Sequence, residues 1–122
     1  MNQSKQLRLG DYIGHIVEAI ERCHDYVEDM DEIAFLSDRK TQDAVIRTFE
    51  VIGEASNNIR KAHPEFVTAH PEIPFAQASG MRNRLSHGYF QVDLAAVWAS
   101  IHADLPPLHE ALLVLRDSLT KP

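Results

Sequence analysis

The sequence predicts an all-α protein, an up-and-down four-helix bundle whose last helix is kinked at Pro106-Pro107. Apolar residues recur three and four positions apart along long stretches, which is the period of a helix with one buried face. Capping residues, prolines and glycines bracket these stretches at positions typical of helix ends. A chain of 122 residues is long enough for one core but not two, so we expect a single domain over residues 1–122.

The first helix is expected over residues 9–30, with Asp11 as its N-terminal cap. Its apolar stripe comprises Ile13, Ile16, Val17, Ile20, Cys23, Val27 and Met30. The single cysteine of the chain, Cys23, belongs to this stripe, so we expect a buried thiol rather than a reactive one. Residues 31–36 should form a turn or a short helical piece.

A second long helix is expected to follow Ser37-Asp38 and to run to about Ala62. Within it, Gly53-Glu54-Ala55 places small residues where another helix can approach closely. Glu54 is better explained as a structural or supporting acid than as a catalytic one. Residues 63–73 hold Pro64 and Pro71, which indicate a loop.

The third helix is expected to start at Pro74, to end at His87 and to be stopped by Gly88. The fourth should begin after Asp93 as its cap and run to Leu105. The two prolines then kink or break it before residues 108–119 continue. Its apolar residues, Trp98 among them, are expected in the core or in a dimer contact.

Charge and composition limit the function. The formal net charge of −6 argues against a general nucleic-acid binder, whose surface is usually basic, but allows one focused basic site. The histidines are never three or four residues apart, so we expect no metal site, and nothing in the chain calls for a cofactor. No apolar run is long enough to span a membrane, and the first five residues do not resemble a signal peptide. With a lone cysteine, this composition predicts a cytoplasmic protein.

The chemistry of the chain is concentrated in residues 82–89, Arg-Asn-Arg-Leu-Ser-His-Gly-Tyr. Arginine presents a permanently charged planar fork of donors to phosphate oxygens, and histidine accepts and donates protons near neutral pH. Arg82 and His87 would therefore suffice to cleave RNA without a metal ion. His87 would take the proton of a ribose 2′-OH, and Arg82 would steady the charge on the phosphate under attack.

Helical spacing refines this hypothesis. Asn83 and His87 share one helix face, so the Asn83 amide can fix the tautomer of the ring. Arg82 lies about 140° from His87 around the axis, so one protomer does not aim both groups at one phosphate. Either the last turn distorts or a second copy completes the site, and we favour a homodimer. The alternative is a surface helix with a solvated arginine and a histidine that stabilises the helix C-terminus.

The Arg82-x-x-x-x-His87-x-Tyr89 pattern, with polar Asn83 after the arginine, resembles the signature of HEPN-domain ribonucleases. More narrowly, the chain resembles the HepT-like toxins, which pair with MntA-like minimal nucleotidyltransferase antitoxins. Supporting residues run from about residue 9 to residue 119: Asp43-Ala44-Val45, Ile52-Gly53-Glu54-Ala55, Met81-Arg82-Asn83, His87-Gly88-Tyr89 and Val97-Trp98.

The resemblance implies a HEPN-type bundle and a metal-independent endoribonuclease that works as a homodimer on RNA, with tRNA as the expected substrate. It implies Arg82 and His87 as the catalytic pair, Asn83 as a polar supporter and Tyr89 as the acceptor of AMP from the antitoxin. AMP at Tyr89 would add negative charge where substrate phosphate must sit. A second hypothesis is a non-catalytic helical module that binds nucleotide or a nucleotidyltransferase and only accepts the modification at Tyr89.

Overall fold

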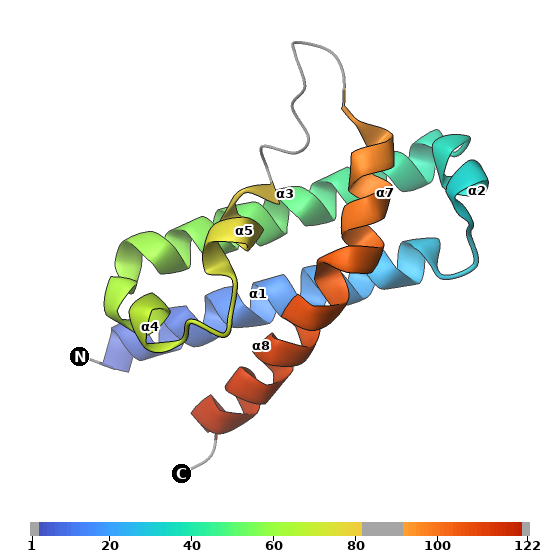
Figure 1. Ribbon diagram of the computed structural model, residues 1–122. Coiled ribbons are helices and arrows are strands. Elements are labelled where there is room, and N and C mark those ends of the chain that lie inside the picture. The colour runs from blue at the N-terminus through green and yellow to red at the C-terminus, as the bar shows by residue number, and fades with distance from the viewer. Residues whose placement is uncertain (1–2, 82–91, 121–122) are drawn as a thin grey trace.

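The computed structural model describes residues 3–81 and 92–120, and every regular element in these two stretches is a helix (Figure 1). The all-α prediction is therefore confirmed for this part of the chain. In chain order the helices are α1 (Gln3–Val27), α2 (Glu32–Leu36), α3 (Arg39–Ala62), α4 (Pro64–Ala69), α5 (Phe75–Ser79), α7 (Leu94–Ala103) and α8 (Leu105–Thr120).

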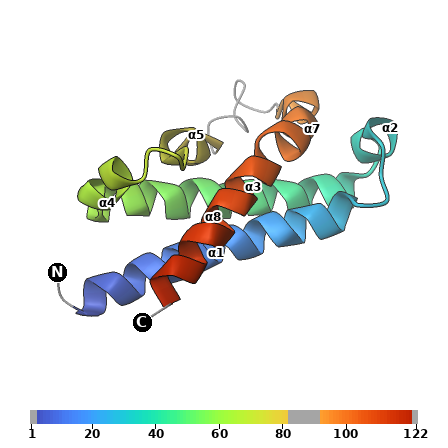
Figure 2. The same cartoon turned by 60° about the horizontal axis from the view of Figure 1, so that its bottom comes forward.

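The two longest helices, α1 and α3, run side by side in opposite directions, and α8 packs obliquely across α1 (Figures 1 and 2). The apolar stripe predicted for α1 is the buried face of this pair, and the matching stripe of α3 meets it. Side chains with no exposed surface there include Ile13, Ile16, Cys23, Val45, Phe49, Ile52 and Ile59. We call this contact the α1–α3 seam; its dry, close packing is the main source of apolar burial in the fold.

The short helix α2 lies at the end of the seam, in the connection between α1 and α3. Asp31 caps α2 by accepting a hydrogen bond from the Ala34 amide at 2.8 Å. Asp38 caps α3 in the same way through the Thr41 amide at 3.2 Å. The piece expected at residues 31–36 is thus a five-residue helix, and the start of the second long helix is as predicted.

The last helix is broken as expected, but the break comes earlier than the prolines. Asp93 caps α7 through the Ala96 amide at 3.0 Å, as predicted. α7 ends at Ala103, and Asp104 separates it from α8. Pro106 and Pro107 then occupy the first turn of α8, where their missing N–H groups cost nothing. A proline ring clashes with the carbonyl four residues earlier, which places the break before the two prolines rather than at them.

Both ends of the first helix and the connection at residues 63–73 were predicted wrongly. α1 begins at Gln3 rather than at residue 9, so Asp11 lies inside the helix and cannot cap it, and the helix ends at Val27 instead of Met30. The stretch 63–73 is not all loop, because α4 occupies Pro64–Ala69. Pro64 stands at its first position, where its fixed φ favours a helix start.

The third predicted helix can be checked only in part. α5 spans Phe75–Ser79 and ends at Gly80, so the single helix expected from Pro74 to His87 is wrong at this point: the glycine interrupts it. Residues 82–87 of that expected helix lie outside the described residues. Among the described helices, none combines the length and the apolar character needed to cross a bilayer.

Candidate functional site

The predicted catalytic and modified residues lie between the two described stretches. Arg82, Asn83, His87 and Tyr89 all fall in residues 82–91, outside the part of the chain that the structure describes. Their geometry therefore stays a prediction, as does the homodimer proposed to complete the site. The structure does show how both ends of this segment are held, and which charges line the grooves elsewhere.

The residues that lead into the segment are fixed in the core. Phe75, Ala78 and Met81 are each 1% exposed, and they share one face of the α5 region. The Gly80 amide donates to the carbonyls of Ala76 and Gln77, both at 3.1 Å, which ends α5 in a tight turn. Met81 is thus a buried anchor one position before Arg82.

Two side-chain contacts tie α5 to its neighbours. The Ser79 hydroxyl donates to the amide oxygen of Asn57 on α3, at 3.5 Å. The Gln77 amide donates to the Asp104 carboxylate at the α7–α8 break, at 3.0 Å. On α3, Gly53 and Ala55 are buried and Glu54 is exposed, so the small residues of this stretch do face the packed interior.

The residues that follow the segment are held as well. Val92 is half-buried and packs against the core. Asp93 comes next and caps α7. The polar segment therefore runs between two apolar anchors, Met81 and Val92, both of which touch the same core. Both residues that flank the predicted catalytic segment are thus packed against the core.

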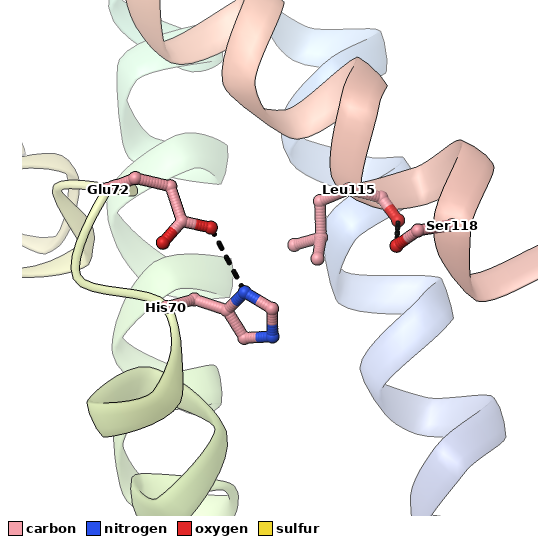
Figure 3. A network of polar contacts seen from close by, with 4 residues as sticks. All are labelled: His70, Glu72, Leu115 and Ser118. Atoms are coloured by element: carbon pink, nitrogen blue, oxygen red, sulfur yellow. Dashed lines mark hydrogen bonds and ion pairs between the residues drawn. The ribbon is translucent and has the colours of Figure 1, made fainter.

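Grooves elsewhere on the described surface do not suit RNA. One groove, of about 410 Å³, lies between the α4–α5 connection and α8 and is lined by His70, Glu72 and Glu110 among others. His70 Nδ1 lies 3.0 Å from Glu72 Oε2, as Figure 3 shows together with Ser118 of α8. Histidine paired with a carboxylate is a possible proton-transfer group. The described lining of this groove holds two carboxylates and no arginine or lysine, so it would repel a phosphate backbone.

Local hydrogen bonds also favour the ionised form of the Glu72 carboxyl. Its own backbone amide and then the His70 side chain lower the pKa of the Glu72 carboxyl from its ordinary value of 4.5. A carboxylate held ionised in this way is a poor general acid. The pair is best understood as a clasp across the turn between α4 and α5.

A second groove, of about 370 Å³, follows α1 and α3 and contains both His15 and two arginines. Arg22 is neutralised by Glu18, with 2.7 Å between Nη2 and Oε1. Arg47 on α3 adds a cation to the same lining. This groove is electrostatically mixed, and it lacks the arrangement of arginine, histidine and polar supporter that residues 82–87 provide in sequence.

The chain's cysteine is not part of any reactive group. Cys23 is free and fully buried, as predicted. Burial raises the pKa of its thiol to about 11, against a smaller lowering by a hydrogen bond with Thr48. The thiolate that a nucleophile requires is therefore scarce at neutral pH.

Sequence analysis missed two histidines that pair with carboxylates. His109 Nε2 of α8 lies 2.9 Å from Glu21 Oε2 of α1, although 88 positions separate the two residues. No pattern of neighbouring residues in the sequence predicts such a pair. The His70 and Glu72 contact had a local signal, a histidine and a carboxylate two residues apart beside Pro71, but that pattern is too common to be informative.

Comparison with known families gives one clear match. The model of the family described as HepT-like, "Ribonuclease HepT-like", matches residues 16–115. That range contains the whole of the 82–89 motif and both of its anchors. The match thus covers most of the chain, including the part whose placement the structure does not describe.

Curated relatives agree with the family match. A protein of Thermococcus cleftensis named "Probable ribonuclease HepT" is 44% identical over 98 residues, which cover 80% of this chain and 86% of that protein. A "Gamma-glutamylcyclotransferase and putative RNase" of Methanocaldococcus jannaschii is 38% identical over 90% of this chain, which spans about half (48%) of that longer protein. A "Putative RNase" of Caldanaerobacter subterraneus is 32% identical over 81% of this chain and 86% of its own length. No solved structure matches the chain.

Proposed function

Because this chain belongs to the HepT-like family of ribonucleases, we propose that it is an endoribonuclease that cleaves RNA without a metal ion, using Arg82 and His87. Its proposed setting is a type VII toxin–antitoxin pair in the cytoplasm, with a MntA-like nucleotidyltransferase as the antitoxin and tRNA as the substrate. No cofactor is required by this chemistry, since the 2′-hydroxyl of the RNA is itself the nucleophile.

The observation that carries the proposal is the family match over residues 16–115, together with the intact Arg82-x-x-x-x-His87-x-Tyr89 pattern inside it. The described structure adds support from outside the motif. Met81 and Val92 fix the two ends of the segment in one core, and the groove beside α8 lacks cations among its described residues. The motif is the best-qualified place for phosphate chemistry in this acidic chain.

In the proposed reaction, neutral His87 removes the proton from a ribose 2′-OH. The 2′-oxygen attacks the adjacent phosphorus, and the bond from phosphorus to the 5′-oxygen of the next nucleotide breaks. The departing 5′-oxygen takes a proton from the imidazolium so formed, directly or through water, which restores neutral histidine and leaves one fragment with a 2′,3′-cyclic phosphate and the other with a 5′-hydroxyl. Arg82 binds the non-bridging oxygens, whose negative charge grows in the transition state.

A second copy of the chain is part of the proposal. In a helical segment Arg82 and His87 point in directions about 140° apart, so each phosphate would be held by an arginine and a histidine from different protomers. Asn83 would hold the His87 ring in the tautomer whose free nitrogen accepts the proton. Pairing would also double the number of cations beside the RNA.

The test is cleavage of purified tRNA by the full chain in the presence of EDTA. Wild-type protein should cut the tRNA and leave 2′,3′-cyclic phosphate ends, and Arg82→Ala and His87→Ala should not. His109→Ala is the matched control, because it removes a histidine outside the motif, one that pairs with Glu21 between α8 and α1, and it should leave cleavage intact. Equal cleavage by His87→Ala would refute the assignment of that residue. Absence of cleavage by all the proteins, on tRNA and on other RNA, would favour the binding-module hypothesis.

Regulation is proposed to act at Tyr89. The nucleotidyltransferase would join the Tyr89 oxygen to the α-phosphorus of ATP and release pyrophosphate. The AMP group would then place a phosphate and a nucleoside two residues from His87, where they repel and block RNA. This switch needs no movement of the bundle, since the charge is added at the site itself.

Tyr89→Phe separates this switch from simple occlusion by the partner. The variant should cleave RNA like the wild type and stay active when the nucleotidyltransferase and ATP are added, and its mass should not increase. The wild type should gain mass in steps of one AMP and lose cleavage in parallel. Neutralisation of Tyr89→Phe without a mass change would show that binding alone inhibits the enzyme.

A further inference from the structure

A cavity of about 510 Å³ opens where the end of α1 meets the junction of α7 and α8. Three of the chain's seven histidines line it, and three carboxylates join them: His24, His102, His109, Glu21, Asp25 and Glu28. Its floor is apolar and includes Ile20, Ile101 and Leu105, all at most 5% exposed. Six groups able to bind a cation thus surround one hollow with a rigid base.

Three of these groups already converge. One donor atom from each of His24, Asp25 and Glu28 lies within 4.8 Å of the others. His24 and Glu28 are four residues apart, and Asp25 is three residues before Glu28, so Glu28 is a surface neighbour of both other residues. Bonds of about 2.0–2.2 Å to a tetrahedral Zn²⁺ place two ligand atoms about 3.4 Å apart. The three side chains would therefore draw closer together, by rotation about their own bonds, to bind one ion.

The electrostatics at this end of α1 favour a cation. α1 ends at Val27, so Asp25 and Glu28 lie at the C-terminus of a 25-residue helix, where the helix dipole disfavours negative charge. Among the described residues, no side-chain hydrogen bond or ion pair involves His24, Asp25 or Glu28. Asp31, further on, is already used as the cap of α2. The neighbouring Glu21 is engaged by His109, which holds α8 against this side of α1.

We propose that His24, Asp25 and Glu28 form a binding site for a divalent transition-metal ion, with Zn²⁺ as the best fit. An imidazole nitrogen with two carboxylates suits Zn²⁺ better than Mg²⁺ or Ca²⁺, which prefer oxygen ligands alone. The cavity leaves room for water on the open side of the ion. The proposal departs from our expectation of no metal site, which considered pairs of histidines and overlooked the Glu21-x-x-His24 and His24-x-x-x-Glu28 spacings.

The ion would act on stability and not on the proposed RNA chemistry. It would neutralise two carboxylates at the C-terminus of α1 and stiffen the wall of the cavity, where α1 faces α7 and α8. Binding to the folded state alone raises the melting temperature, by about 10 °C when free Zn²⁺ is 100 times the dissociation constant. Cleavage in EDTA should continue, because the motif at residues 82–89 would need no metal.

The experiment is a calorimetric titration of EDTA-stripped, dialysed full-length protein with ZnCl₂, paired with thermal unfolding. Wild type should bind one Zn²⁺ per chain and melt at a higher temperature, and the same concentration of Mg²⁺ should leave the melting temperature unchanged. His24→Gln and Glu28→Gln should each weaken Zn²⁺ binding at least tenfold. Both side chains are exposed, so these variants should fold normally, which circular dichroism checks.

His15→Gln is the matched control, since His15 is exposed on the same helix and lies outside the cavity. It should bind Zn²⁺ like the wild type. The proposal is overturned if no stoichiometric site tighter than about 100 μM is found. It is equally overturned if His24→Gln binds as tightly as wild type, or if His15→Gln loses affinity to the same extent, because the ion would then be held by scattered surface groups.

Discussion

The α1–α3 seam and the connection from α5 to α7 differ in composition and in proposed role. The seam holds the fold together, and the connection carries the residues proposed for catalysis. The seam consists of fully buried apolar side chains such as Ile16, Phe49 and Ile52. The connection carries Arg82, His87 and their polar neighbours between two apolar anchors. If the proposed site is right, chemistry and stability depend on different parts of the chain, and substitutions in the two regions should have opposite effects on activity and on folding.

On this account, a motif of eight residues can carry the proposed chemistry while the rest of an acidic helical chain supplies only the fold. The bundle must only bring the two ends of the connection to one place, and any well-packed core will do so. The proposed chemistry then depends on a handful of side chains that contribute little to burial. The predictions below are ordered by their expected effect on folding.

The largest effect is expected from Phe49→Ala, which opens a cavity in the seam. Phe49 is fully buried, and a phenylalanine-to-alanine change at such a site costs about 3–5 kcal/mol. Urea unfolding measures this loss against Glu50→Ala, whose side chain is exposed and whose effect should stay within about 0.5 kcal/mol. RNA cleavage by Phe49→Ala should fall only as the folded fraction falls. A larger loss of cleavage than of folded protein would show that the seam shapes the active site directly.

Next in size is the response of Cys23 to pH. Its pKa is raised from 9.0 to about 11 in the fold, so folding favours the neutral thiol. The stability it contributes is complete below pH 9 and is lost as the pH rises toward 11. The melting temperature of wild type should therefore fall more steeply between pH 9 and 11 than that of Cys23→Ala. Iodoacetamide at pH 8 should label the folded thiol at least about a hundredfold more slowly than the unfolded one, and fast labelling would contradict its burial.

A smaller effect is expected at the far end of the connection. Asp93→Ala removes the cap of α7 and should cost about 1 kcal/mol, whereas Asp93→Asn keeps a capping oxygen and should cost less. Since Asp93 follows Val92 directly, Asp93→Ala should also reduce cleavage by more than its loss of stability explains. The ratio of the two losses, measured by denaturation and by tRNA cleavage, tests whether the anchors position the motif. Loss of stability without any extra loss of activity would sink that idea.

The smallest effect is expected from Ser56→Ala. Ser56 is fully buried on α3, and its hydroxyl has no hydrogen-bond partner among the described residues. Removing a buried hydroxyl that is unsatisfied should leave the free energy of unfolding unchanged or raise it by up to about 1 kcal/mol. A loss of more than about 1 kcal/mol would reveal a partner for Ser56 within residues 82–91.

Sequence periodicity was enough to find the long helices. Ile13, Phe49 and Val97 each belong to an apolar stripe with helical spacing in their own helix, and all three are buried. It failed where a local signal had two meanings. Pro64 was interpreted as a loop residue although proline also starts helices, and here it starts α4. Asp11 has the chemistry of a cap, but the helix continues to Gln3.

For the functional residues the limits are different. The Arg82 and His87 pair could be proposed from sequence because the two residues are close in the chain and their chemistry is specific. The His109–Glu21 pair was missed because only tertiary packing brings α8 to α1. The proposed zinc ligands did have a local signal, the His24-x-x-x-Glu28 spacing, but such a spacing is common on solvated helix faces. Local patterns thus propose sites built on one segment, and they miss contacts between helices.

The most direct test of the division between chemistry and stability is to measure tRNA cleavage in EDTA and thermal unfolding on one preparation of His87→Ala. We predict that the cleavage rate falls at least about a hundredfold, as for loss of a general base, while the melting temperature stays within about 3 °C of wild type. Cleavage at the wild-type rate by a normally folded His87→Ala protein would contradict the account.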